Sequence, residues 1–270
     1  MLKVVLFAPI QTSLYSRLVL HGLLHDEQVQ VVGIVVRTPW NPKRIRSEFS
    51  RDGGRLVQKF IRKFLLREKA FAGVKVDNLA AAAGRAALPA ANLHRLAGQH
   101  TIPFKAVKDL NDEKSVAFLQ EAAPDIIVFT GGGLVRQVVL DIPKLGVLNC
   151  HSGVLPPFRG MDVVEWTAME NAVKSTGFGI TLHYMDKGVD TGPIVMVKRI
   201  AANTDDTFSS IRMRLEVEMV NTMLMGVHAI AADSVHSSPQ NVQDGKQYFV
   251  MHPRIKHIAE KKLANQLCGN

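Results

Sequence analysis

The chain has 270 residues, of which 47% are hydrophobic and 21% are charged, and its formal net charge is +9. This composition excludes a disordered or fibrous protein and allows one large domain or a domain with appendages. The apolar run at the amino terminus is shorter than a signal peptide or a membrane span requires, and the two cysteines lie far apart in the sequence. We therefore expect a reduced cytoplasmic protein with no membrane span.

The positive charge is concentrated in one segment, from Arg37 to Lys69. This segment holds eleven Lys or Arg residues and three acidic residues, a net charge of +8. Between Leu56 and Leu65 the apolar residues recur every three or four positions, which predicts a basic amphipathic helix. Such a helix can bind an anionic substrate or tRNA, lie on an anionic membrane surface, or present a solvated face while its apolar side packs on the core.

The predicted elements of the amino-terminal half alternate between strands and helices. They are a strand at 4–7, a helix at 13–24, a strand at 30–36, a helix-prone stretch at 79–91, a helix end at 93–97, a strand at 103–107, a helix at 113–122 and a strand at 125–130. This alternation predicts an α/β fold, a Rossmann-like, doubly wound and mostly parallel sheet. The basic segment then belongs to a helical insertion at about 39–92.

The carboxyl-terminal half predicts a strand at 146–150 and a later pair of strands at 176–184 and 194–200. Thr204 to Asp206 supply a predicted N-cap for a long helix that ends at about Ala231. A short strand at 247–250 and a final basic helix follow. We expect a catalytic domain over 1–205, with the helices and short strand of 206–270 packed on it or appended to it.

Three glycines, Gly131, Gly132 and Gly133, end the buried strand predicted at 125–130. Glycine permits backbone conformations that other residues avoid, and it lets a ligand approach the main chain closely. In open α/β sheets, ligands bind at the carboxyl ends of the strands. The glycine turn is therefore a candidate ligand site.

Asn149 and His151 flank Cys150 at the end of another predicted strand, where alternate residues point the same way. An amide and an imidazole side by side suit attack of an amine on an acyl group, because Asn can donate to the oxyanion and His can share a proton. Asp190, in the glycine-rich turn 186–193, is the candidate carboxylate that holds the imidazole. Spacing alone favours the other interpretation, a loop anchor and ordinary turn chemistry.

From Ile127 to Ile194 the chain resembles the catalytic core of the folate-dependent formyltransferases, which include methionyl-tRNA, glycinamide ribonucleotide and sugar N-formyltransferases. The matching motifs keep the family's order and separations: the turn 131–134 (GGGL), 143–149 (PKLGVLN), 151–156 (HSGVLP), Arg159-Gly160, 179–183 (GITLH) and 185–192 (MDKGVDTG). By position, Asn149, His151 and Asp190 fall on the family's catalytic Asn, His and Asp.

The resemblance implies that 10-formyltetrahydrofolate is the formyl donor and that neither a metal nor a nucleotide cofactor is required. It implies that Asn149 and His151 stabilise the oxyanion, while Asp190 orients His151 and assists proton transfer. The implied donor-binding residues are Gly131, Gly132, Gly133, Leu134, Val135, Asp186 and Gly188.

Three positions bear on the details of this site. The family commonly has Ser two residues after the His and Pro a few residues after the Arg-Gly pair, where this chain has Gly153 and Val163. These departures affect the expected acceptor pocket and leave the three catalytic positions unchanged. For His183 we expect a packed strand residue, with a place in the lining of the pocket as the alternative.

The acceptor amine is the open question at this point. The turn from Ala8 to Leu14 has no glycine, which disfavours glycinamide ribonucleotide, whose phosphate needs backbone amides. We expect a small amine such as a nucleotide-linked amino sugar. The alternatives are methionyl-tRNA formyltransferase-like activity, suggested by the basic segment although the usual carboxyl-terminal barrel is missing from this sequence, hydrolysis of the formyl folate, and a non-catalytic folate-binding module.

Overall fold

The computed structural model of the protein describes residues 1–38 and 77–268. In this part of the chain the main sheet has seven strands, in the order β3-β2-β1-β4-β5-β7-β8. They are β1 (Leu2–Ala8), β2 (Val29–Arg37), β3 (Phe104–Val107), β4 (Ile126–Phe129), β5 (Gly146–His151), β7 (Phe178–Tyr184) and β8 (Ile194–Ile200). The first five run parallel, and β7 and β8 are antiparallel additions at one edge. The predicted Rossmann-like, mostly parallel sheet is confirmed.

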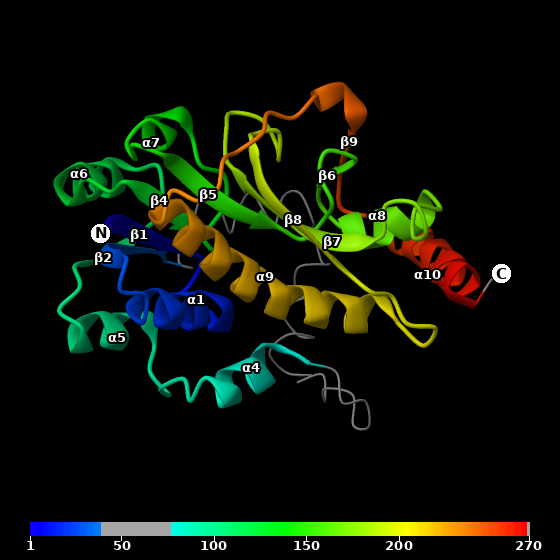
Figure 1. The fold of residues 1–270 in the computed structure, drawn as a ribbon, viewed down its shortest axis with the longest axis horizontal. Coiled ribbons are helices and arrows are strands. Elements are labelled where there is room, and N and C mark those ends of the chain that lie inside the picture. Colours follow the sequence, from blue (N-terminus) through cyan, green and yellow to red (C-terminus); the bar gives the residue numbers. More distant parts are fainter. Residues whose placement is uncertain (39–76, 269–270) are drawn as a thin grey trace.

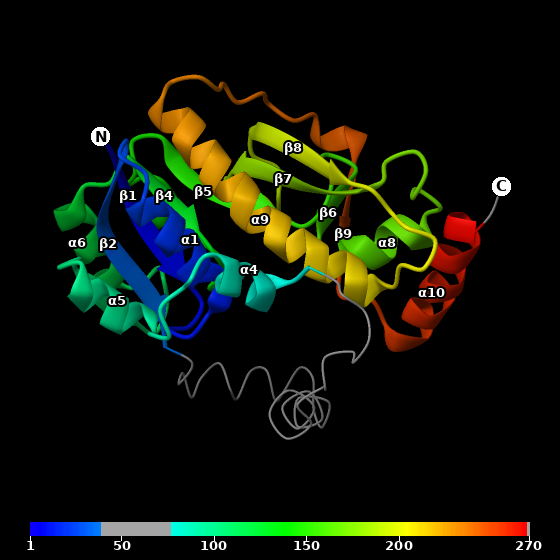
Figure 2. The ribbon, with the colours of Figure 1, turned by 60° about the horizontal axis from the view of Figure 1, so that its bottom comes forward.

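Helices cover both faces of this sheet (Figures 1 and 2). Alternate residues of β1 enter two separate apolar clusters: Val4 and Leu6 pack on one face, and Val5 and Phe7 pack on the other. The first face is covered by α1 (Leu14–Leu24), α5 (Leu93–Gln99) and α9 (Phe208–Ala231), and the second by α6 (Glu113–Ala122) and α7 (Gln137–Leu140). Burial on both faces explains why β1 and β4 are continuous apolar runs.

The strand order reverses between β1 and β4, because β1 pairs with β2 on one side and with β4 on the other. At such a reversal the connections leave toward opposite faces and open a crevice at the carboxyl ends of the strands, where ligands bind. Gly131 to Gly133 follow β4 directly at this edge. The carboxyl end of β5, with Asn149 and His151, lies one strand further along.

Of the remaining elements, α4 (Leu79–Arg85) packs against α1 and α9. The others form a smaller group: β6 (Phe158–Gly160), α8 (Val163–Met169), the 3-10 helix η1 (Val242–Asp244), β9 (Lys246–Tyr248) and α10 (Pro253–Cys268). Strands β6 and β9 pair in parallel as a separate two-stranded sheet, and α8 packs against α10. The division of the chain near residue 205 stays a prediction.

Several predicted boundaries differ from the structure. The N-cap of α9 is Thr207 rather than a residue of Thr204 to Asp206, because Thr207 and Ser210 exchange side chain to backbone hydrogen bonds in a capping box. The residues predicted as a helix end at 93–97 form the separate short helix α5, which Asn92 caps.

The proposed helical insertion lies largely outside the described residues. Of the basic segment Arg37 to Lys69, only Arg37 and Thr38 are described, so the predicted basic helix falls outside them. The described part of the insertion, from residue 77 to 92, contains α4. Within residues 1–38 and 77–268, no helix combines the length and the apolar character that a bilayer crossing requires.

Candidate active site

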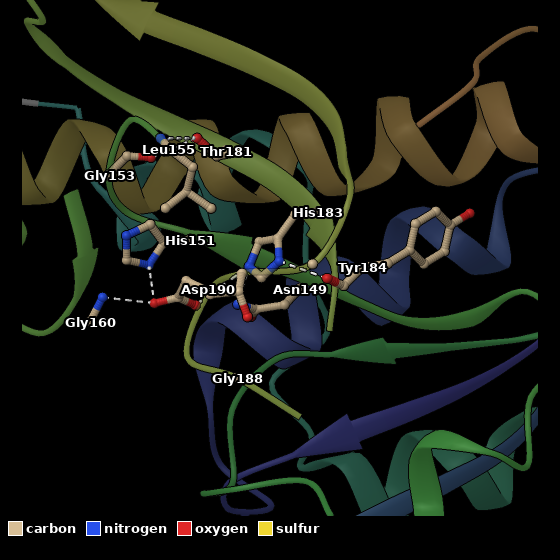
Figure 3. A network of polar contacts seen from close by, with 12 residues as sticks. Asn149, His151, Gly153, Leu155, Gly160, Thr181, His183, Tyr184, Gly188 and Asp190 are labelled. Atoms are coloured by element: carbon tan, nitrogen blue, oxygen red, sulfur yellow. Dashed lines mark hydrogen bonds and ion pairs between the residues drawn. The ribbon is translucent and has the colours of Figure 1, made fainter. Parts of the chain in front are cut away.

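Strand β5 presents its last residues alternately to two environments. The Cys150 side chain packs in the apolar cluster on the α9 face, where burial raises the pKa of its thiol. A thiol in such surroundings stays protonated and is a poor nucleophile. Its neighbours Asn149 and His151 point away from that cluster, toward the loop that carries Asp190 (Figure 3).

His151 and Asp190 come together, as the sequence pattern suggests. The distance between His151 Nδ1 and Asp190 Oδ2 is 3.4 Å, and the two side chains are 7% and 14% exposed. The other ring nitrogen, Nε2, lies 2.9 Å from the carbonyl oxygen of Phe158. A carbonyl oxygen only accepts hydrogen bonds, so Nε2 carries the hydrogen. In the neutral ring, the lone pair on Nδ1 therefore faces the Asp190 carboxylate.

The pKa of His151 lies below its ordinary value of 6.5. Burial of the ring is the largest cause, because it penalises the charged form, and the nearby Asp190 carboxylate offsets part of that effect. At neutral pH the ring is mainly neutral. Nδ1 and Oδ2 are then two proton acceptors that point into the same space.

Asp190 is held in an unusual backbone conformation. Its φ is +53°, in the left-handed region that Asp tolerates better than most residues. The Gly160 N–H donates to Oδ2 at 2.9 Å. Burial alone would raise the pKa of the Asp190 carboxyl, but contact with His183, the charge of His151 and the Gly160 N–H together lower it. The carboxylate is therefore ionised at neutral pH.

His183 also belongs to this cluster. It lies on β7 directly opposite Asn149 and is 1% exposed. Its Nδ1 lies 2.8 Å from the carbonyl oxygen of Tyr184, so Nδ1 carries the hydrogen and the neutral ring has its lone pair on Nε2. The Asn149 Nδ2 group lies 3.1 Å from that atom and donates to it. Among the described residues the second N–H of the Asn149 amide makes no further hydrogen bond, so it can donate to a ligand.

A proton on Nε2 of His183 would reverse this arrangement. The ring would then donate toward Asp190 Oδ1, which is 3.5 Å away, and it would no longer accept from Asn149. The sequence prediction treated His183 mainly as a packed strand residue, but the structure shows that it is buried and also contacts two of the three candidate catalytic residues.

The predicted donor-binding residues occupy two loops beside this cluster. Gly131, Gly132 and Gly133 have φ values of +118°, +137° and +105°. A Cβ on Gly132 would lie 2.7 Å from Leu110 Cδ1, and the positive φ of all three glycines would strain any other residue. The next residue, Leu134, is 73% exposed, whereas Val135 is buried. The turn thus offers bare backbone next to an apolar surface.

The second loop is organised by Asp186. Its Oδ1 accepts hydrogen bonds from the Gly188 N–H at 2.9 Å and from the Thr191 hydroxyl at 2.6 Å. These bonds close the turn that leads into Asp190. In the structure, Asp186 and Gly188 thus shape the loop that carries the carboxylate.

A sequence model of formyl transferases matches residues 55–227, which is more than half of the chain. The chain belongs to the formyl transferase family. Two similar members are methionyl-tRNA formyltransferases, from Kosmotoga olearia (32% identical over 148 residues, 54% of this chain and 47% of the relative) and Thermotoga maritima (32% over 131 residues, 48% and 41%). This formyl transferase family member thus spans about half the length of the curated relatives it matches.

Solved structures of other family members share the fold. A phosphoribosylglycinamide formyltransferase from Anaplasma phagocytophilum superimposes with a TM-score of 0.58 at 17% identity, over 92% of this chain and 99% of its own. A sugar N-formyltransferase from a Shewanella species does so with a TM-score of 0.56 at 13% identity, over 97% and 87%. These likenesses extend the family's fold to nearly the whole chain.

We expect substitutions at His183 to separate its hydrogen bonding from its packing. In His183→Leu the side chain stays buried, but Asn149 loses its acceptor, so kcat for formyl transfer should fall by about 10²-fold, the lower range for loss of an oxyanion donor. His183→Gln retains a carbonyl that can accept from Asn149 and should lose less. Steady-state kinetics of the two variants check this expectation, and equal losses in both would contradict it.

Proposed function

We propose that this family member transfers a formyl group from 10-formyltetrahydrofolate to the primary amine of a small acceptor. The observation that carries the proposal is the cluster at the carboxyl end of β5, where Asn149, His151, His183 and Asp190 contact one another. In this proposal residues 1–205 form the catalytic domain, and residues 206–270 extend it.

The roles of the side chains follow from their hydrogen bonds. The acceptor nitrogen forms a bond to the formyl carbon, and the bond between that carbon and the donor nitrogen breaks. The free N–H of Asn149 stabilises the negative charge that develops on the formyl oxygen. His151 Nδ1 and Asp190 Oδ2 together accept the proton that the attacking amine must lose, and a proton returned to the donor nitrogen completes the balance.

The donor fits the two loops beside the cluster. The folate supplies the formyl group on a flat heterocycle whose edge carries hydrogen-bonding groups. The bare backbone of Gly131 to Gly133 and the exposed side chain of Leu134 suit such a ring, because a peptide edge can pair with it while an apolar surface covers its face. Asp186 and Gly188 hold the second loop in place.

A cavity of about 280 Å³ lies on the α9 face of β5. It is lined by Ser152, which follows His151 directly, and by Tyr15, Leu79, Arg212, Leu215, Glu216 and Met219. The Tyr15 hydroxyl is buried and has no hydrogen-bond partner among the described residues. Because Asn149 and His151 point away from this face, the cavity is separate from the catalytic cluster, and the preference for a small acceptor rests on the sequence pattern.

The experiment that tests the proposal is incubation of the protein with 10-formyltetrahydrofolate and a panel of amines, followed by mass spectrometry of the products. The panel contains nucleotide-linked amino sugars, other small amines and aminoacyl-tRNA. We expect a mass increase of one formyl group on a small amine. Formylation of aminoacyl-tRNA alone would favour the tRNA alternative, and formate release without an amine would favour hydrolysis. No turnover with any acceptor would contradict the proposal.

The ionisation of His151 gives a second prediction. In the free protein, a histidine NMR titration should place the pKa of His151 below 6.5, because burial disfavours the charged ring more than Asp190 favours it. In Asp190→Asn that carboxylate is lost, so the pKa should fall further. The His151 resonance can be assigned with a His151→Gln variant. A rise of the pKa in Asp190→Asn would contradict the assigned contact.

A further inference from the structure

After α9 the chain returns across the molecule to the neighbourhood of the candidate active site (Figure 1). We call residues 238–251 the return segment. It begins at Ser238, which exchanges two backbone hydrogen bonds with Ile194, of 2.8 and 2.7 Å, and it continues through η1 and β9. The sequence prediction placed this segment in a carboxyl-terminal extension and gave it no part in the chemistry.

The return segment contacts the backbone of the Asp190 loop through one side chain. Gln240 Nε2 donates to the carbonyl oxygen of Asp190 at 3.2 Å and to that of Gly192 at 2.5 Å. One amide group therefore joins two carbonyls on either side of Thr191. Asp190 has a left-handed backbone conformation, which needs support from its surroundings to persist. Gln240 supplies such support on the main-chain side of the carboxylate.

The same segment also reaches the group that holds the Asp190 side chain. The Gly160 N–H that donates to Asp190 Oδ2 belongs to β6, and β6 pairs with β9 of the return segment, Gly160 opposite Tyr248. The adjacent Arg159 is 8% exposed, and its Nη2 donates to the carbonyl oxygens of Val242 and Gly245 at 3.1 and 3.0 Å. These contacts fix β6 relative to the segment.

Aromatic residues strengthen this attachment. The Tyr248 ring lies 5.4 Å from that of Phe158 in a stacked arrangement and 5.1 Å from that of Trp166. The Trp166 indole N–H donates to the carbonyl oxygen of Phe249 at 2.8 Å. The return segment is thus held rigidly at β9, and Gln240 extends from it toward the Asp190 loop.

We propose that Gln240 is a positioning residue that fixes the Asp190 carboxylate against His151. This inference rests on the proposed formyl transfer, but its structural part can be tested without turnover. The return segment supports Asp190 in two ways. Gln240 donates to its backbone carbonyl, and β9 pairs with β6, whose Gly160 N–H donates to its carboxylate.

The test uses Gln240→Met in the full-length protein. Methionine has nearly the same length and no N–H, so it preserves packing while it removes both hydrogen bonds. We expect kcat for formyl transfer to fall by about 10²-fold, the loss that a displacement of about 1 Å produces at an active site. The KM values for donor and amine should stay within about threefold, because binding precedes the step that needs Asp190.

A spectroscopic measurement separates positioning from general stability. His151 faces the ionisable groups Asp190 and His183, and the Asp190 carboxylate favours its charged form. If Gln240→Met displaces Asp190, the NMR titration midpoint of His151 should move in the same direction as in Asp190→Asn. A lower thermal midpoint with an unchanged His151 titration would overturn the positioning role.

The matched control is Gln243→Met, the same substitution at an exposed position of the same segment. It should leave kcat and the His151 titration unchanged. If Gln240→Met does not fold, Gln240→Leu provides the same readouts. If the wild-type protein transfers no formyl group, the proposed function fails, but the His151 titration still decides whether Gln240 holds Asp190. Equal behaviour of the Gln240 and Gln243 variants would overturn the inference.

Discussion

Replacement of Asp190 by asparagine is expected to lower kcat for formyl transfer by about 10²- to 10⁴-fold, the usual contribution of a positioned acid or base. Asparagine has the same shape, and its carbonyl can still accept from the Gly160 N–H, so the loop should keep its conformation. The amide cannot take a proton at pH 7. With its carbonyl at the Oδ2 position, its NH2 group would lie at the Oδ1 position, next to His183 Nε2. The pair of proton acceptors that faces the amine would be lost.

The affinity for the folate donor should change by less than about tenfold in the same variant, because Asp190 acts mainly in the transition state. Equilibrium binding of tetrahydrofolate and single-turnover kinetics measure the two effects separately. A matched control is Asp141→Asn, which makes the same substitution at the exposed end of α7, where Asp141 accepts from Gln137. Near wild-type turnover in Asp190→Asn would remove the assignment of Asp190 as a proton acceptor.

The parts of the fold that the sequence predicts well are those with a local signal. The helix expected at 113–122 coincides with α6, because Asp112 caps it and Leu119 lies on its buried side. Similarly, β1 and β4 are apolar runs because the sheet buries both of their faces. In these elements the hydrophobic pattern and the end signals agree, and tertiary contacts change only their boundaries.

One strand and one helix start that depend on three-dimensional contacts were not predicted correctly. Strand β6 has three residues and forms only because β9, far away in the sequence, pairs with it. The N-cap of α9 was misplaced because Asp206 is also a good capping residue, but its carboxylate accepts from the Asn203 N–H and the Ser210 hydroxyl instead. A choice among several polar residues in one turn depends on three-dimensional geometry that local spacing does not contain.

The candidate site likewise combines residues that the local sequence predicts with residues that only distant contacts bring into place. Alternation along a strand places Asn149 and His151 on one side, which the sequence alone predicts. The position of His183 opposite Asn149 depends on the antiparallel register of β5 and β7, and that register is set by the whole edge of the sheet. A polar residue in an otherwise apolar strand was the available signal, because a buried imidazole needs partners. Gln240 offered no such signal, since it lies in a polar stretch.

A side chain at position 153 is expected to be nearly as damaging to catalysis as a change of Asp190. A Cβ on Gly153 would lie 2.7 Å from His151 Nε2 and 2.8 Å from Val163 Cγ2, closer than real Cβ atoms approach their neighbours. Gly153→Ala should therefore displace the imidazole and break its hydrogen bond to the Phe158 carbonyl. We expect kcat to fall by about 10²-fold and overpacking to destabilise the fold by about 1–3 kcal/mol.

Steady-state kinetics and thermal unfolding measure these two effects in Gly153→Ala. The control is Gly98→Ala in α5, where an added Cβ would meet no atom within 4 Å. Alanine also favours a helix over glycine, so this control should unfold no earlier than the wild type. Unchanged kcat in Gly153→Ala would mean that the ring of His151 tolerates displacement and that its tight surroundings are unrelated to turnover.

The same contacts place the two expected departures from the family pattern next to each other. Gly153 and Val163 stand where the family commonly has Ser and Pro, and Val163 Cγ2 occupies the space next to the missing Cβ. Val163 is the first residue of α8, and the preceding Asp162 has a left-handed backbone conformation that a proline at 163 would disfavour, so alanine is the better replacement. Gly153→Ser should lower kcat and stability more in the wild type than in a Val163→Ala background, which lacks the Val163 Cγ2 methyl group. A double-mutant cycle measures this coupling, since residues in contact deviate from additivity by about 0.5–3 kcal/mol. Strictly additive effects would show that the two positions vary independently.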